Sequence, residues 1–388
     1  MYLCEDMKMI RSQADACLFI SKDKDERTQL IASCHVDDTL LVGTKDSIEE
    51  FKVKLKVRFK IKDLGLMVRH LGIWYDWRTD ENGEPYVVAT MNSLIEEIIK
   101  VTEQHLGRTL CEKDTPGKAG DVLEGTDDPV VEEKMYRTIV GKIMYLTHKL
   151  MLEGVNAARE MSKFFMKPQK QHWKAVEFFV GYLKQERDKI KMTFRKPKEL
   201  RFMAVADSSY GTDKLKRRST SGVIYTVGGT ITGWLSKAQT HTTLSSSEAE
   251  YAALASAGQE LIFITNVIDE IETSERPGII FGDNESALAL VKNRQVSART
   301  KHIDIRHHFL RDLWEKGHLG VAHIPGEENE ADICTKNIIS RLHQKHRGRI
   351  REGRLWLNQW LNISTTRRED VVTYSEQSTV RVVEIIED

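Results

Sequence analysis

Two short stretches decide the fold that this sequence predicts: residues 202–207 read FMAVAD, and residues 278–283 read GIIFGD. Each is a brief apolar run that leads to an aspartate, which is typical of a buried β-strand with a polar end. If the two strands are adjacent and parallel, Asp207 and Asp283 emerge at one edge of a sheet. Open α/β sheets usually carry their sites at that edge.

The segments around these two stretches extend the same layer. Residues 221–227 and 230–236 alternate in polarity around Gly228-Gly229, a strong hairpin pattern. Ser245 and Glu248 have the spacing of a capping box, which predicts a helix to about residue 271. Helices at 302–316 and 329–336 and a strand at 319–324 follow. The order of three strands, helix, strand, helices, strand and helix predicts an α/β layer fold with a mixed sheet.

Two further acids lie where this fold can use them. Glu250 is one turn into the long helix, and Asp332 is near the start of the last helix. With Asp207 and Asp283 they offer four hard oxygen ligands, which suit two Mg²⁺ or Mn²⁺ ions. Two such ions roughly 4 Å apart support in-line phosphoryl displacement. The simpler alternative is that each acid is only a helix cap or a turn residue.

Composition narrows the function classes. The chain has 388 residues, 40% of them hydrophobic and 30% charged, and its formal net charge is zero. Any nucleic-acid surface must therefore be local. The five cysteines form no CxxC pair, which favours a reducing, intracellular setting over a disulfide framework. No apolar run reaches 18 residues and no leader pattern begins the sequence, so we expect neither a membrane span nor secretion.

The N-terminal half has a different pattern. Apolar runs at 30–32 and 40–42 flank Asp37 and Asp38, which predicts a hairpin with two carboxylates at its tip. Helical patterns near 136–150 and 172–185 make the middle of the chain α-rich. Residues 341–354 hold six Lys or Arg and one acid, and the last 20 or so residues are polar. This end is expected to be a loose tail, in which the basic stretch either follows a nucleic-acid backbone or is merely solvated.

Residues 200–340 resemble the ribonuclease H domain of copia-type retrotransposon polyproteins. The matching segments are ADSSYG, RRSTSGVIYTVGGTITGWLSKAQ, LSSSEAEYAAL, GDNESALAL, RTKHIDIRHHFLRD and HIPGEENEADICTK. The resemblance implies that Asp207, Glu250, Asp283 and Asp332 are catalytic residues that bind two divalent metal ions. It also implies cleavage of the RNA strand of an RNA–DNA hybrid. Glu248 is left as the helix cap.

Upstream segments resemble the second half of a copia-type reverse transcriptase: CHVDDTLLVG, FKIKDLGLMVRHLGI, YRTIVGKIMYL and HWKAVEFFVGYLK. The resemblance implies a partial palm at 1–92, a thumb and connection at 93–198, the nuclease domain at 199–340 and a tail at 341–388. Asp37 and Asp38 fall on the catalytic pair of the palm. The strand that carries the remaining palm aspartate is absent, His35 replaces the usual Tyr, and no fingers precede the palm. Polymerase activity is therefore not expected of this chain alone.

Some features depart from the family pattern, and others allow more than one interpretation. Residues 325–331 lack the loop histidine that many cellular ribonucleases H carry before the last Asp. Lys216, Arg217 and Arg218 are either phosphate contacts beside the site or a solvated turn. The expected partners are an RNA–DNA hybrid and the upstream part of the polyprotein, without a membrane. The alternative function is a catalytically weak nucleic-acid-binding remnant or a host-adopted retroelement protein.

Overall fold

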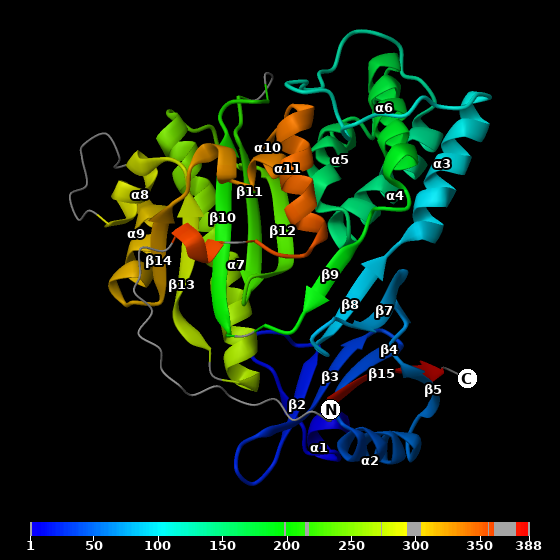
Figure 1. Ribbon diagram of the computed structural model, residues 1–388, viewed down its shortest axis with the longest axis vertical. Coiled ribbons are helices and arrows are strands. Elements are labelled where there is room, and N and C mark those ends of the chain that lie inside the picture. Colours follow the sequence, from blue (N-terminus) through cyan, green and yellow to red (C-terminus); the bar gives the residue numbers. More distant parts are fainter. Residues whose placement is uncertain are drawn as a thin grey trace. The chain divides into compact units, whose positions relative to one another are not determined.

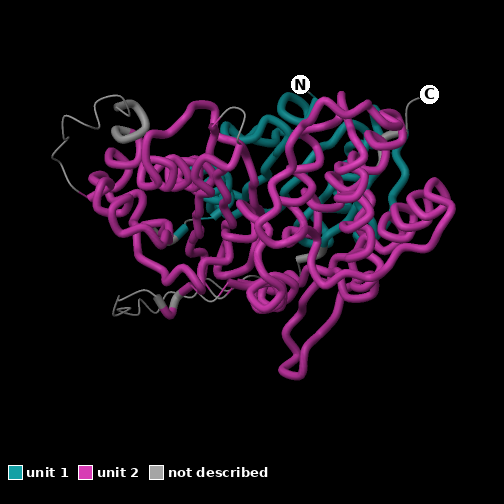
Figure 2. Tube along the Cα trace, turned by 90° about the horizontal axis from the view of Figure 1, so that it is seen from above, with its two compact units in different colours: residues 1–71, 262–274, 364–388 teal, residues 72–261, 275–363 magenta. Residues whose placement is uncertain are grey.

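The computed structural model describes residues 2–197, 199–213, 217–272, 274–292, 304–355, 357–360 and 378–386. The chain divides into two compact units, which are coloured separately in Figure 2. Unit 1 comprises residues 1–71, 262–274 and 364–388. Unit 2 comprises residues 72–261 and 275–363.

Unit 2 contains the mixed sheet that the sequence predicts (Figure 1). Its strands lie in the order β12-β11-β10-β13-β14. The pairs β12–β11 and β11–β10 are antiparallel, whereas β10–β13 and β13–β14 are parallel. The strands are β10 (Arg201–Ser209), β11 (Thr220–Val227), β12 (Thr230–Ala238), β13 (Glu275–Gly282) and β14 (Leu319–His323). The expected element order and mixed α/β class are thus present.

The predicted glycine turn is also confirmed. Gly228 and Gly229 join β11 to β12 with φ values of 55° and 79°. Two successive left-handed residues suit the right-handed twist of the flanking strands, and glycine adopts them without steric cost.

Helices and a second sheet complete unit 2. The helices are α3 (Asn92–Leu106), α4 (Glu133–Lys149), α5 (Val155–Ser162), α6 (Lys170–Glu186), α8 (Glu285–Lys292), α9 (Asp304–Glu315), α10 (Asp332–Thr335) and α11 (Ser340–Arg351), with short 3₁₀ turns η1 (Leu152–Gly154), η3 (Gly326–Glu328) and η4 (Leu357–Trp360). Strands β7 (Ile73–Thr79), β8 (Pro85–Thr90) and β9 (Met192–Arg195) pair in antiparallel order. Residues 115–129, between α3 and α4, form no helix or strand.

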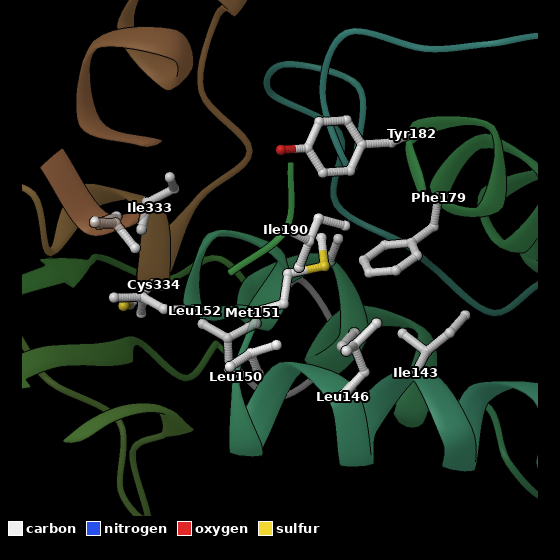
Figure 3. Packing of buried hydrophobic residues seen from close by; sticks show 14 of the residues in the cluster. Ile143, Leu146, Leu150, Met151, Leu152, Phe179, Tyr182, Ile190, Ile333 and Cys334 are labelled. Carbon is white, nitrogen blue, oxygen red and sulfur yellow. The ribbon is translucent and has the colours of Figure 1, made fainter. Parts of the chain in front are cut away.

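One hydrophobic core joins the helices to the mixed sheet. Leu146 of α4, Leu150 directly after it, Phe179 of α6, and Ile333 and Cys334 of α10 belong to the same buried cluster (Figure 3). The short helix that carries Asp332 therefore packs against the helix-rich segment. The boundary expected at residues 198 and 199 does not separate two hydrophobic cores.

Helix α7 (Ser246–Ile271) belongs to unit 2 as far as Leu261 and to unit 1 from Ile262. Among the described helices it alone is long and apolar enough to cross a membrane. Half of its apolar window is buried inside the protein, with Ala249, Ala253 and Leu261 fully buried. A core helix of a soluble protein meets the same criteria, so this is weak evidence for a membrane span.

Unit 1 is built on a six-stranded sheet with the order β1-β2-β3-β4-β15-β5. Its elements are α1 (Tyr2–Glu5), β1 (Ile10–Arg11), β2 (Leu18–Lys22), β3 (Thr28–His35), β4 (Asp38–Thr44), α2 (Lys45–Lys56), β5 (Lys60–Leu66), β6 (Arg69–His70) and β15 (Ser378–Ile386). The hairpin predicted around Asp37 and Asp38 is the β3–β4 pair.

The expected loose tail at 341–388 is wrong for two segments. Residues 340–351 form α11, in which His343, His346, Ile350 and Arg351 are buried. Residues 378–386 form β15, which pairs with strands from the first seventy residues. Charge and polarity suggested solvent exposure, but the partners of both segments are remote in sequence.

Candidate active site

The aspartates of the two deciding stretches come together at one sheet edge. Strand β10 pairs in parallel with β13, with Val205 opposite Phe281. Asp207 lies two residues beyond Val205, and Asp283 two residues beyond Phe281, so both carboxylates belong to the same level of the sheet. Asp207 is 2% exposed, and Asp283 is half-buried.

Asp332 reaches this edge through a loop that is fixed to β10. The buried side chain of Asn329 donates from Nδ2 to the carbonyl oxygen of Ala206 at 3.0 Å. Its Oδ1 accepts from the backbone N–H of Ala331 at 3.1 Å. One carboxamide thus links the residue before Asp207 to the residue before Asp332. A second link is the Thr335 hydroxyl, which donates to Oδ2 of Asp207.

Three of the four predicted carboxylates form one cluster. Asp207, Asp283 and Asp332 each offer an oxygen atom, and these atoms all lie within 4.8 Å of one another. Glu250 lies outside that group, on α7. It is still close enough for the charge of Asp283 to affect its pKa.

Burial and mutual repulsion disfavour the charged forms of these groups. Burial, followed by the charge of Asp332, raises the pKa of Asp207 well above its ordinary value. Burial, followed by the charge of Asp283, raises the pKa of Glu250 to about 7. The pKa of Asp332 is also raised, chiefly by burial. A cluster of this kind is costly without a neutralising cation.

Lys336 is the cation that the chain itself supplies. Its Nζ lies 2.8 Å from Oδ1 of Asp332, and its side chain is 45% exposed. Burial alone would lower its pKa, but the charges of Asp207 and Asp332 outweigh that effect and raise it. The ammonium group therefore stays charged and offsets part of the repulsion.

The residues fit a divalent metal ion of the Mg²⁺ or Mn²⁺ type. Hard carboxylate oxygens are the ligands that these ions prefer. Two of the three clustered aspartates are at least nine-tenths buried, and each has a raised pKa that a bound cation would oppose. The structure thus brings together three of the four predicted ligands, Asp207, Asp283 and Asp332.

Two neighbouring features have separate roles. Glu248 accepts from the backbone N–H of Leu244, while Ser245 accepts from the backbone N–H of Glu248. Glu248 therefore caps α7, as expected. In the loop before Asp332, a side chain at Gly326 would begin 3.3 Å from Oδ2 of Asp283, so this loop lies directly over the site.

The other predicted site residues lie elsewhere. Asp37 lies in the turn of the β3–β4 hairpin in unit 1, after Val36, which has a φ of 53°, and Asp38 is the first residue of β4. The described residues form no cluster of three metal ligands that includes either aspartate. Lys216 lies outside the described residues. Arg217 is exposed and Arg218 is half-buried.

Comparisons with known proteins show that the chain is similar to retroelement polyproteins. It is 29% identical over 337 residues to the retrovirus-related Pol polyprotein from transposon TNT 1-94 of Nicotiana tabacum, covering 85% of this chain and 25% of that protein. It is 32% identical over 206 residues to that from transposon RE2 of Arabidopsis thaliana, covering 52% and 14%. Its homologues are retrovirus-related Pol polyproteins of copia-type transposons. The family resemblance of the sequence is thereby confirmed.

The chain spans about a quarter or less of the length of the Pol polyproteins that it matches. No protein-family model matches it. Among solved structures, LC11-RNase H1 isolated from compost matches 35% of this chain and 93% of its own, with 18% identity and a TM-score of 0.29. The same enzyme in complex with an RNA/DNA hybrid matches with a TM-score of 0.28 and 18% identity, covering 35% of this chain and 94% of its own.

Two residues of this Pol-related chain were missed by sequence reasoning. Lys336 lies four residues after Asp332, a spacing that brings side chains together on a helix, and this pattern was available. Asn329 offered no such pattern, because its partner at Ala206 is 123 residues away. Only the folded chain shows that it joins the two ends of the site.

Proposed function

We propose that this chain is a metal-dependent endonuclease that cuts the RNA strand of RNA–DNA hybrids, as part of a retrotransposon protein related to reverse transcriptase. The observation that carries the proposal is the cluster of Asp207, Asp283 and Asp332 at the edge of parallel strands, with Glu250 beside it. The copia-type Pol homologues support a retroelement nuclease. Two Mg²⁺ or Mn²⁺ ions would be held by these four carboxylates.

When bound, such ions supply Lewis-acid stabilisation of a phosphoryl group and a water molecule of lowered pKa. The chain's own contribution is to hold the ligands in place. Asn329 and Thr335 fix Asp332 relative to Asp207 through the buried hydrogen bonds described above. Preorganised ligands avoid the entropic cost of assembling the site at each turnover.

The decisive experiment compares cleavage of a labelled RNA–DNA hybrid with Mg²⁺ by the unaltered chain and by Asp283→Asn. Removing one ligand of a catalytic metal forfeits several kcal/mol of stabilisation. That implies a rate loss on the order of a thousandfold or more, at about 1.36 kcal/mol per tenfold. Asp312→Asn is the matched control, because Asp312 is an exposed residue of α9. Equal rates for Asp283→Asn and the control would refute the assignment.

The rival proposal, a nucleic-acid-binding remnant, predicts that the unaltered chain binds the hybrid without cutting it. The activity is proposed to be intracellular, with the upstream part of the polyprotein as a partner. Asp37 and Asp38 are proposed to be a polymerase remnant. Unit 1 groups neither of them with a third described ligand, although two-metal nucleotidyl transfer needs ligands that bridge both ions.

A further inference from the structure

In the sheet of unit 1, two strands that are consecutive in the sequence leave a gap between them for a third strand. Strands β4 and β5 follow each other along the chain and are joined by α2, but they do not pair. The C-terminal strand β15 lies between them and is antiparallel to both. Its register runs from Ser378 opposite Thr44 to Glu384 opposite Asp38 on the β4 side. On the β5 side it runs from Arg381 opposite Leu66 to Ile386 opposite Lys60.

The segment fits the gap through both backbone and side chains. It hydrogen-bonds along two strand edges, which gives affinity in the manner of β-strand addition. Val382 and Val383 are 2% and 0% exposed, and Val383 belongs to a buried cluster with Leu41, Ile48 and Phe51. Three of the four residues at 380–383 are valine, a strong strand former.

The segment is also separable from the rest of the sheet. All other strands of the sheet lie within residues 10–66, whereas β15 begins at residue 378, after every described element of unit 2. Closing so long a loop costs more entropy than forming the local hairpins and the β4–α2–β5 connection. The local strands therefore do not depend on β15 for their chain connections.

We propose that the gap between β4 and β5 is a strand-binding site. Its ligand is an extended segment with valines at two successive positions, supplied by residues 378–386 of this chain, and the segment docks and undocks while unit 2 stays folded. Docking sets Glu384 opposite Asp38 in the backbone register, so it also gives the Asp37–Asp38 hairpin its outer neighbour strand. This site is independent of the proposed nuclease.

The test uses the full-length chain and its variant Val383→Asp, with Val53→Asp as the matched control. Val53 lies on α2 of the same unit and is 65% exposed. Hydrogen exchange followed by mass spectrometry should show faster exchange of residues 38–44 and 60–66 in Val383→Asp, with α4 and α6 unchanged. A fluorescein-labelled peptide of residues 378–388 should then bind Val383→Asp and restore the protection. The unaltered chain and Val53→Asp should not bind it.

Several results would overturn the proposal. Equal protection of residues 38–44 in the unaltered chain and Val383→Asp would show that the valine does not hold the strand in the gap. Loss of protection in α4 and α6 as well would show that the strand is not separable. Failure of Val383→Asp to bind the peptide, or equal binding of a peptide that itself carries Val383→Asp, would show that the gap does not recognise this segment.

Discussion

Replacing Glu250 by Gln should stabilise the metal-free protein, although it removes a proposed ligand. The pKa of this carboxyl group is raised in the folded chain, first by burial and then by the charge of Asp283. At pH values between the pKa of Glu250 in the unfolded chain and its raised pKa in the folded chain, the folded state therefore binds more protons than the unfolded state. An acid with a raised folded pKa makes the free energy of unfolding fall as pH rises through that range.

The size of the effect follows from the two pKa values. Glu250 moves from 4.5 to about 7 on folding. A pKa difference of one unit corresponds to about 1.36 kcal/mol. Above pH 8 the raised pKa of Glu250 therefore lowers the free energy of unfolding by about 3 kcal/mol. Near pH 4.5 the same relation gives a loss in the free energy of unfolding of only about 0.4 kcal/mol.

The assay is urea unfolding of Glu250→Gln and the unaltered chain between pH 4.5 and 8.5, with EDTA present. Glu327→Gln is the control, because Glu327 is exposed in the loop before Asp332. The stability advantage of Glu250→Gln should grow with pH, whereas Glu327→Gln should show none. Added Mn²⁺ should reverse the order by stabilising the unaltered chain more. Parallel pH profiles for the two variants would refute the reasoning.

Three other predictions follow from the same structure. Lys336→Met should lower metal-free stability by about 1 kcal/mol, since the ammonium group is half-exposed, and should tighten Mn²⁺ binding in calorimetric titration. The buried His343 and His346 have pKa values lowered by burial to about 3 and about 4. Unfolding at pH 5 should therefore cost about 2 kcal/mol less per histidine than at pH 7, because the unfolded state takes up the protons, and His343→Leu with His346→Leu should abolish that loss. The chain alone should not extend a primer with Mg²⁺ or Mn²⁺, and Asp37→Asn should leave hybrid cleavage unchanged.

The parts of the fold that sequence predicted are those whose cause is local. The apolar runs before Asp207 and Asp283 encode buried strands within a few residues, and Gly228-Gly229 encodes its turn directly. The capping box at Glu248 is equally local. These features allowed the sequence to predict that Asp207 and Asp283 emerge at one sheet edge if their strands are adjacent and parallel.

Local patterns failed where a charge or an aromatic ring depends on a distant partner. The basic residues of α11 looked solvated, yet Arg351 is buried and pairs with Glu153 and Glu186 at 2.9 and 2.7 Å. Breaking a buried pair of this kind by removing one partner is costly. Trp74 and Trp77 of β7 are large apolar residues, yet they are 44% and 37% exposed. Aromatic character alone does not say which face of a strand is covered.

The C-terminal strand shows most clearly why such information is absent from local sequence. Residues 378–386 carry a strand pattern, but a strand pattern does not name its neighbours. The edges that accept it belong to β4 and β5, and nothing in either strand indicates that a third strand enters between them. A polar chain end is therefore interpreted as an exposed tail, because composition predicts exposure but does not predict which strands pair. The same non-local dependence makes β15 the element whose removal should affect unit 1 without touching the carboxylate cluster of unit 2.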